Sequence, residues 1–94
     1  MTIMQEMTIK HNLIYQVYME KRTKLYRDFD FGRISEDDFE RMEEHYRNVY
    51  HSNLLRFFRK LTWQEQIYFC IATDNPFMVE RLDAEQLATM KIVA

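Results

Sequence analysis

The sequence predicts a single all-α domain in which a long antiparallel helical hairpin is followed by short helices. Only one glycine and one proline occur among 94 residues, which leaves too little turn-forming material for a multi-stranded sheet. Apolar residues recur at intervals of three and four along two long segments, the spacing of one helix face. The single glycine lies between these two segments, where a hairpin would turn.

The first helix is expected to begin near Thr2, which has Gln5 three residues later as a capping partner, and to run to about Asp28. Its apolar stripe is interrupted where Lys21 and Arg22 occupy positions on the buried face. Long cationic side chains that extend to water, or a local ion pair, explain this interruption, and a ligand site is the alternative. The stripe comprises Met4, Met7, Leu13, Ile14, Val17, Tyr18, Leu25 and Phe29.

The turn of the hairpin is marked by three independent signals. Gly32 suits the left-handed residue that ends a helix. Ser35 and Asp38 have the spacing of a capping box for the next helix, and Ile34 with Phe39 fits a hydrophobic staple across it.

The second helix is expected from Glu36 to about Lys60, a length of roughly 38 Å at the rise of an α-helix. Acidic residues gather at its N-terminus and basic residues at its C-terminus, as the helix dipole favours. So long a helix suggests pairing with other copies. Its apolar stripe comprises Phe39, Met42, Tyr46, Val49, Tyr50, Leu54, Phe57, Phe58 and Leu61.

Three further start signals follow the hairpin. They predict a helix over 63–73, a turn of helix through residue 81 and a last helix to about residue 91, with residues 92–94 frayed. The first segment is apolar almost throughout, so we expect it to pack against the hairpin or a partner. The signals are Thr62 with Glu65, Asn75 with Pro76, and Asp83 with Gln86.

Composition bounds the class of protein. The chain is 47% hydrophobic and 15% aromatic, which is more apolar surface than a slim hairpin can hide, so we expect a homo-oligomer. Thirteen basic and 15 acidic residues give a net charge of -2, which provides no long-range attraction for nucleic acid.

Cys70 is the only cysteine and has apolar neighbours, which predicts an inert core thiol in a reducing compartment. No apolar run resembles a signal peptide or a membrane span, so we expect a cytoplasmic protein.

Catalytic and metal-binding patterns are missing from the sequence. No histidine and carboxylate lie one helical turn apart in a metal-binding motif, and His11, His45 and His51 are expected at the surface or an interface. There is no glycine-rich phosphate loop, and no local motif places a nucleophile beside a histidine. We therefore expect a protein that is not an enzyme and that uses no metal or cofactor.

Aromatic and cationic residues are the candidate ligand-binding groups. Tyrosines and one arginine recur on one face of the first helix, where rings can stack on a flat ligand and a guanidinium can meet phosphate. Packing within the core is the other interpretation of such a stripe. The candidates, including both cationic clusters, are Tyr15, Tyr18, Arg22, Lys24, Tyr26, Arg27, Arg33, Arg56, Arg59 and Lys60.

The hairpin distinguishes the two cationic clusters. The first, Lys21 to Arg27, should face Glu40, Glu43 and Glu44 across the hairpin and form an ion-pair network with them. The second, Arg56 to Lys60, has almost no acidic residues opposite it, so its charges are the better candidates for binding an anion.

In size and layout the chain resembles the phage anti-CBASS proteins, small helical proteins that assemble into oligomers and sequester cyclic dinucleotides and trinucleotides between copies. The resemblance implies a non-enzymatic counter-defence protein in the cytoplasm of an infected bacterium. It implies Tyr15 or Tyr18 stacking on bases and Lys24, Arg27 or Arg33 meeting phosphate. It spans about Ile14 to Lys60 and rests on Tyr15, Tyr18, Arg22, Lys24, Arg27 and the turn at Gly32.

Two other functions fit the same sequence. The acidic face over residues 36–44 could mimic nucleic-acid phosphates in a protein-binding inhibitor of a host defence protein, such as an anti-CRISPR. Alternatively, the chain is a dimerisation or scaffold module in which Tyr15, Tyr18 and Tyr26 all belong to the core.

Overall fold

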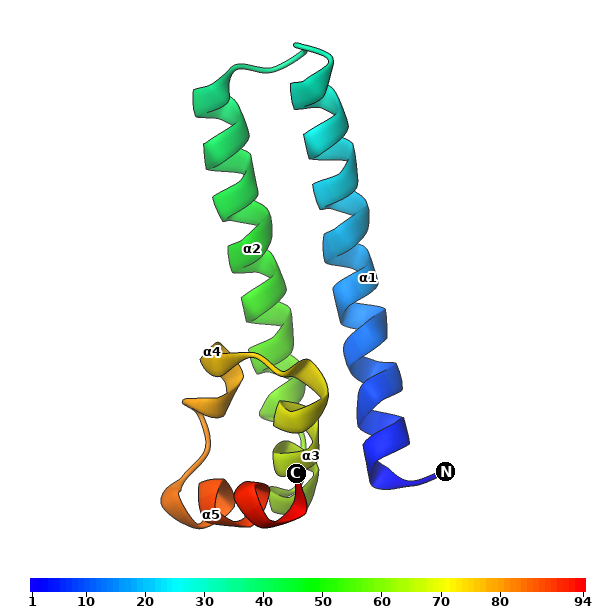
Figure 1. The fold of residues 1–94 in the computed structure, drawn as a ribbon, viewed down its shortest axis with the longest axis vertical. Coiled ribbons are helices and arrows are strands. Elements are labelled where there is room, and N and C mark those ends of the chain that lie inside the picture. Colours follow the sequence, from blue (N-terminus) through cyan, green and yellow to red (C-terminus); the bar gives the residue numbers. More distant parts are fainter.

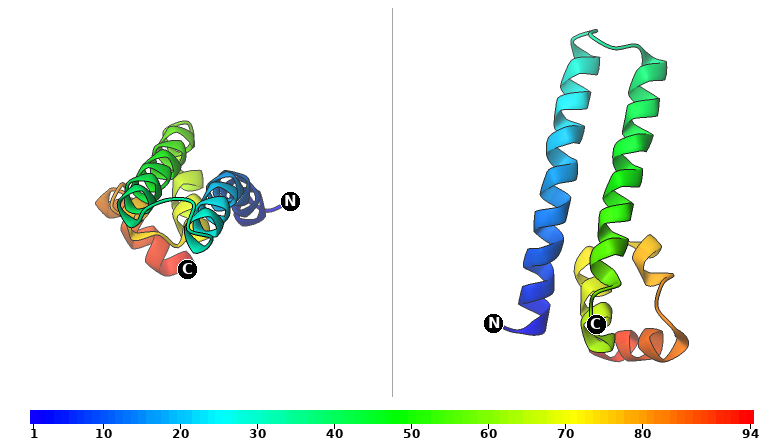
Figure 2. Two further views of the ribbon diagram at one scale, coloured as in Figure 1. Left: turned by 90° about the horizontal axis from the view of Figure 1, so that it is seen from above. Right: turned by 180° about the vertical axis from the view of Figure 1, so that it is seen from behind.

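The structure is a computed structural model that describes residues 1–94, and its secondary structure consists of helices joined by short turns (Figure 1). Two long antiparallel helices form a hairpin, and three short helices gather at the end of the hairpin far from its turn (Figures 1 and 2). The molecule is elongated, with extents of 48 × 27 × 21 Å. The helices are α1 (Ile3–Asp30), α2 (Glu36–Phe58), α3 (Trp63–Thr73), α4 (Pro76–Val79) and α5 (Ala84–Val93).

The two long helices confirm the predicted hairpin. Helix α1 begins with the expected capping box, in which Thr2 and Gln5 each bind the other's backbone N–H, and it ends two residues later than predicted. Helix α2 begins at Glu36 as predicted and ends at Phe58, two residues early. The starts of both helices follow from local capping by Thr2 and Ser35, which can be recognised in the sequence alone.

The turn differs from its prediction in one detail. Gly32 has a φ of +70°, as a left-handed residue at a helix end requires. The Ser35 hydroxyl accepts a hydrogen bond from the Asp38 backbone N–H at 3.1 Å, so half of the predicted capping box is present. The other half is absent, because the Asp38 carboxylate instead pairs with Arg41 one turn later.

The short helices follow their start signals. Capping boxes are present at Thr62 and Asp83, and Asn75 accepts a hydrogen bond from the Phe77 N–H with Pro76 in the first helical position. The prediction of frayed C-terminal residues was wrong for residues 92–93, because α5 continues to Val93.

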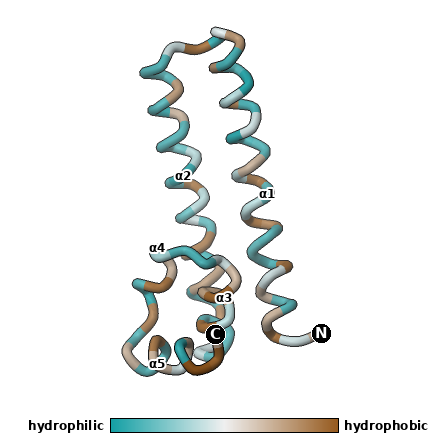
Figure 3. The backbone as a smooth tube through the Cα atoms, viewed as in Figure 1, coloured by the Kyte–Doolittle hydropathy of each residue, from teal (hydrophilic) through white to brown (hydrophobic).

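The core lies at the end of the hairpin where the short helices pack. Helix α1 packs against α2 along the hairpin and against α3 near the N-terminus. The expected burial of the apolar α3 segment is confirmed. Hydrophobic stretches of the backbone are concentrated in these short helices (Figure 3), and Ile67, Phe69, Cys70 and Met78 are buried there. The core cluster consists of Met7, Tyr50, Leu54, Phe58, Phe69, Cys70 and Met78.

The half of the hairpin nearest the turn has no third layer. Between residues 8 and 49, Leu25 is the only buried side chain. Near the turn, the ring of Phe39 lies 5.0 Å from that of Tyr26 and 4.5 Å from that of Phe29. Large apolar side chains that remain exposed on the hairpin include Ile9, Leu13, Tyr15, Val17, Tyr26, Phe31 and Val49.

Candidate functional site

A groove runs between α1 and α2 in the middle of the hairpin. Its volume is about 280 Å³, and no residue of α3, α4 or α5 contributes to it. It is more enclosed than the larger hollows on the surface, because two helices rather than one form its walls. The lining residues are Ile14, Val17, Tyr18, Lys21, His45, Tyr46, Val49, Tyr50 and Asn53.

Helical spacing places these side chains. Ile14 and Tyr18 lie one turn apart on the inner face of α1, and Val17 and Lys21 lie one turn apart at its edge. Lys21 is exposed and has no carboxylate within 4 Å, so its charge is uncompensated at the rim. The break in the apolar stripe at this position therefore puts a cation beside a partly aromatic groove.

One end of the groove is closed by packed aromatic rings. Tyr18 stacks on Tyr50 with ring centroids 4.8 Å apart and an interplanar angle of 14°. Tyr15 meets Tyr50 edge to face at 5.8 Å and stacks on His11 at 5.6 Å. Tyr15 and Tyr18 thus each commit ring surface to intramolecular packing, which limits what they can offer to a ligand.

A partly buried hydrogen bond fixes this aromatic cluster. The Tyr50 hydroxyl lies 2.9 Å from Nε2 of His11. Burial raises the pKa of Tyr50 to about 12 and lowers the pKa of His11 from its usual value. The phenol is therefore protonated and the neutral imidazole is favoured near pH 7, so the pair is a structural element without charge.

Tyr46 is the aromatic lining residue outside that cluster. Its nearest ring is His45, tilted at 5.8 Å, and its side chain is half-buried in the groove. The sequence pattern assigned Tyr46 to the apolar stripe and His45 to the surface or an interface, and it gave no signal for Asn53. The signal that could have found them is the hairpin register, which places residues near 18 opposite residues near 50.

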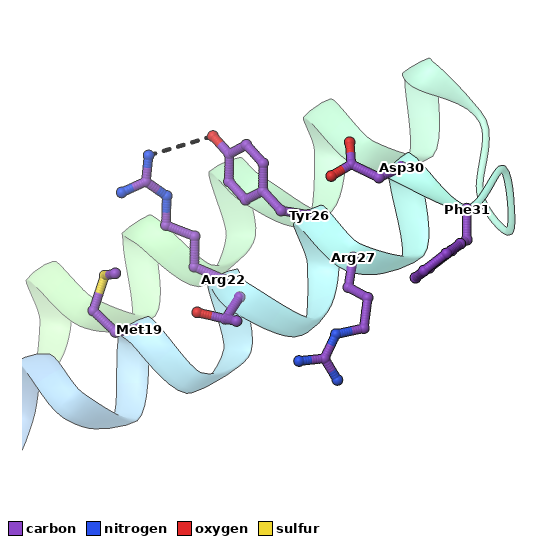
Figure 4. Close-up of a pocket in the computed structure, with 7 residues that line it drawn as sticks. Met19, Arg22, Tyr26, Arg27, Asp30 and Phe31 are labelled. Atoms are coloured by element: carbon purple, nitrogen blue, oxygen red, sulfur yellow. Dashed lines mark hydrogen bonds between the residues drawn. The ribbon is translucent and has the colours of Figure 1, made fainter.

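Arg22 and Tyr26 form a second arrangement near the turn (Figure 4). Nη2 of Arg22 donates to the Tyr26 hydroxyl at 3.3 Å, and that hydroxyl donates to the Glu43 carboxylate at 2.8 Å. The hydrogen bond with Tyr26 raises the pKa of Arg22. These contacts join the two helices of the hairpin.

The predicted ion-pair network across the hairpin was wrong. No cation of the first cluster lies within 4 Å of Glu40, Glu43 or Glu44, and the tyrosine hydroxyl bridges Arg22 to Glu43 instead. Glu43 forms its ion pair along its own helix with Arg47, at 3.4 Å. The Tyr26 hydroxyl thus links Arg22 of α1 to Glu43 of α2 without a direct ion pair.

The hollow in Figure 4 has only one wall. All seven of its lining residues come from α1 and its C-cap, and its volume of about 500 Å³ is open to solvent. Arg27 is exposed here with no acidic partner within 4 Å, and Lys24, which is also unpaired, lines a neighbouring open hollow on α1. Arg33 pairs with Asp28 at 3.2 Å. A single helix surface can attract an anion but cannot enclose one.

The second cationic cluster shares no cavity. Arg56, Arg59 and Lys60 are exposed, none forms an ion pair, and none lines a described hollow. Of the predicted site residues, Tyr18 therefore lines the groove, and Arg22, Tyr26 and Arg27 line the open hollow. The two cationic clusters do not share a site.

Metal and thiol chemistry lack a geometric basis in the structure. No three His, Cys, Asp or Glu side chains are grouped to hold a metal ion. Cys70 is buried as predicted, its Sγ donates to the Met78 carbonyl at 3.5 Å, and burial raises its pKa to about 11. The thiol is therefore protonated near neutral pH and shielded from solvent.

None of the five helices has the length and apolar content that a bilayer crossing demands. Comparison with protein-family models, curated proteins and solved structures finds no match for this chain.

Proposed function

We propose that the protein is not an enzyme but binds and sequesters a cyclic oligonucleotide in the groove between α1 and α2. The observation that carries this proposal is the pairing of a partly free tyrosine ring, Tyr46, with an uncompensated cation, Lys21, in one two-walled groove. Tyr46 stacks on a base and Lys21 meets phosphate, while Asn53 and His45 offer hydrogen bonds to base edges.

The size of the groove favours a ligand shared between copies. Its volume of about 280 Å³ is slightly below the range of roughly 300–1,000 Å³ typical of small-molecule sites. One base with its phosphate therefore fits, and the rest of the ligand needs a further wall beyond α1 and α2. A cyclic dinucleotide or trinucleotide presents several equivalent nucleotide units, so each unit can occupy the groove of a different copy.

Binding by this route requires no chemical step. The groove walls belong to two capped helices, and the stacked pair of Tyr18 and Tyr50 closes one end. Rigid walls lower the entropy lost on binding, which is what sequestration of a scarce messenger demands.

Calorimetry with a panel of cyclic dinucleotides and trinucleotides tests the proposal. The wild type should release or absorb heat with at least one of them, and Lys21→Glu should weaken that affinity by roughly ten- to a hundredfold, because a charge-assisted contact becomes a repulsion. Lys60→Glu is the matched control, since this exposed cation lies outside the groove. Absence of heat with every ligand rejects the function, and loss of binding in the Lys60 variant alone moves the site to the second cationic cluster.

Tyr46 provides an independent test of the stacking role. Tyr46→Leu keeps an apolar side chain in the groove but removes the ring, which should cost about 1–3 kcal/mol of binding free energy. Tyr46→Phe keeps the ring and should bind as the wild type does to within a few fold. Equal affinity of the Leu and Phe variants would remove Tyr46 from the site.

The acidic start of α2 supports a second candidate function, inhibition of a host defence protein by mimicry of nucleic-acid phosphates. Glu36, Asp37, Glu40 and Glu44 are exposed, and none has a basic partner within 4 Å. Binding through this face should weaken steeply with salt and be lost on reversal of Glu40 and Glu44 to lysine. The groove should tolerate the same reversal, because neither residue lines it.

A further inference from the structure

Helix α1 presents an apolar strip to solvent. Ile9, Leu13 and Val17 follow one another at intervals of four residues and are 46%, 57% and 54% exposed. Side chains at this spacing lie above one another on one helix face. Three contiguous aliphatic side chains left half in water on a single face indicate that this face is covered by something else.

Charged residues flank the strip in an ordered way. Glu6 and Lys10 lie towards the N-terminus of the helix, and Glu20 and Lys24 lie towards the C-terminus. At 3.6 residues per turn, these residues and the strip fall within about 120° of arc. All four charges are exposed and none forms an ion pair. The only hydrogen bond among them joins Glu20 to Gln16 at 3.4 Å, so the charges are available to a partner.

We propose that this face is the contact surface of a homodimer in which α1 of one copy packs antiparallel on α1 of a second copy. With the two-fold axis midway between Leu13 and Val17 along the strip, Leu13 faces Val17 of the second copy. Lys10 then faces Glu20, and Glu6 faces Lys24. Because a two-fold contact is self-complementary, each of these pairings occurs twice.

The charge order selects both the partner and its orientation. Glu6 and Lys10 precede Leu13 and Val17 on this face, and Glu20 and Lys24 follow them, so antiparallel pairing sets each of these four charges against its opposite. Parallel pairing sets Glu6 against Glu6 and Lys10 against Lys10, which is repulsive. A membrane surface or a nucleic acid would attract the two lysines and repel the two glutamates. A second copy satisfies all four.

The pairing also deepens the proposed function, and this part of the inference rests on that function. Val17 and Lys21 belong to the edge of the groove, and Val17 also belongs to the contact strip. A second helix seated on the strip therefore borders the groove and can provide the additional wall that a cyclic oligonucleotide requires. The pairing itself stands without any ligand.

A charge-swap experiment on the full chain tests the dimer. The double variant E6K/E20K makes the four charges all basic, and K10E/K24E makes them all acidic. Each should sediment near the 11.7 kDa of one chain, whereas the wild type should approach twice that mass at high micromolar concentration. An equimolar mixture of the two variants should recover the mass of the dimer, because opposite faces then meet.

Matched variants keep the test interpretable. E36K/E44K makes the same change of charge on exposed positions of α2 and should sediment as the wild type does. Leu13→Arg places a charge in the centre of the strip and should also yield a monomer, and circular dichroism confirms that each variant remains helical. A wild type that stays at 11.7 kDa, or double variants that both remain dimeric, would overturn the pairing. A dimer that gives no heat with any cyclic oligonucleotide would reject the function alone, and a ligand-binding monomer would reject the pairing alone.

Discussion

The two ends of the hairpin are built differently. At the end far from the turn, α3 adds a third helix to α1 and α2, and Leu54 and Phe69 are fully buried there. Near the turn, two helices face each other with Leu25 as the buried contact and with Arg22, Tyr26 and Glu43 joined at the surface. Two helices alone cannot exclude water from both of their apolar stripes, so stability concentrates where a third helix is present.

This difference assigns separate roles to the two ends. The buried residues of the three-helix end hold the fold together, while the outer surface of the hairpin carries the groove, the uncompensated cations and the apolar strip of α1. Mutations at the first end should therefore act on the free energy of unfolding. Mutations on exposed hairpin positions should act on association and binding.

The largest expected effect is at Phe69. Its ring is fully buried between α1 and α2, 5.1 Å from the ring of Phe57 and 6.3 Å from that of His11. Phe69→Ala should lower the free energy of unfolding by about 3–5 kcal/mol, measured by urea denaturation. Trp63→Ala, at an exposed position of the same helix, is the control and should cost far less. Equal costs would mean that α3 does not anchor the core.

The next effect compares two buried leucines. Leu54 is 0% exposed in the core, and Leu25 is 3% exposed in the two-helix half. Leu54→Ala should cost about 2–5 kcal/mol. Leu25→Ala should fall at the lower limit of that range, because the two helices near the turn can close on the vacated space. Paired denaturation curves check this difference, and a larger cost at Leu25 would contradict the proposed concentration of stability.

A smaller effect is expected at Gly32. Its φ of +70° is unfavourable for any residue with a Cβ, although a Cβ there would meet no atom within 4 Å. Gly32→Ala should therefore cost about 1 kcal/mol from backbone conformation alone. Gly32→Asn should cost less, because asparagine tolerates the left-handed region. Thermal denaturation of the two variants tests the order, and an alanine variant as stable as the wild type would show that the turn relaxes freely.

The smallest effect concerns pH. Burial lowers the pKa of His11 below its usual 6.5, so the unfolded chain binds the proton more readily than the folded one. The stability that this histidine contributes is thus present above about pH 6.5 and is lost as pH falls below that value towards the folded pKa. His51, whose pKa is lowered by burial and by Arg47 and Arg81, acts in the same direction.

Denaturation midpoints between about pH 8 and about pH 5 measure this dependence. His11→Gln should reduce the slope below pH 6.5 relative to the wild type. A wild-type slope that His11→Gln leaves intact would place the titration elsewhere. A reduced slope places the pH sensitivity of stability within the aromatic cluster that closes one end of the groove, and an intact slope places it outside.

Most of the secondary structure could be predicted because its signals are local. The side chains of Thr2, Thr62 and Asp83 each accept a hydrogen bond from the backbone N–H three residues later. These bonds lie within a single helical turn, so they do not depend on tertiary contacts. The incomplete box at Ser35 shows the limit of this reasoning, since Asp38 had a competing partner in Arg41.

The candidate site could be predicted only in part. Tyr15 and Tyr18 share a helix face as expected, yet their rings pack against Tyr50, a residue of the other helix. The sequence pattern identified cations that could bind an anion. It could not show that Lys21 lies at the rim of a groove with Tyr46 opposite it. Such placement depends on the distance and rotation between two helices.

By itself, the sequence determined the hairpin, its turn and the starts of all the helices, because periodicity and capping act over a few residues. Only the tertiary structure decided which rings stack, which charges remain unpaired and where two helices leave a groove. These outcomes depend on contacts between residues that are distant in the chain, such as Tyr18 with Tyr50 and Tyr26 with Glu43, and a spacing rule along one helix does not contain them.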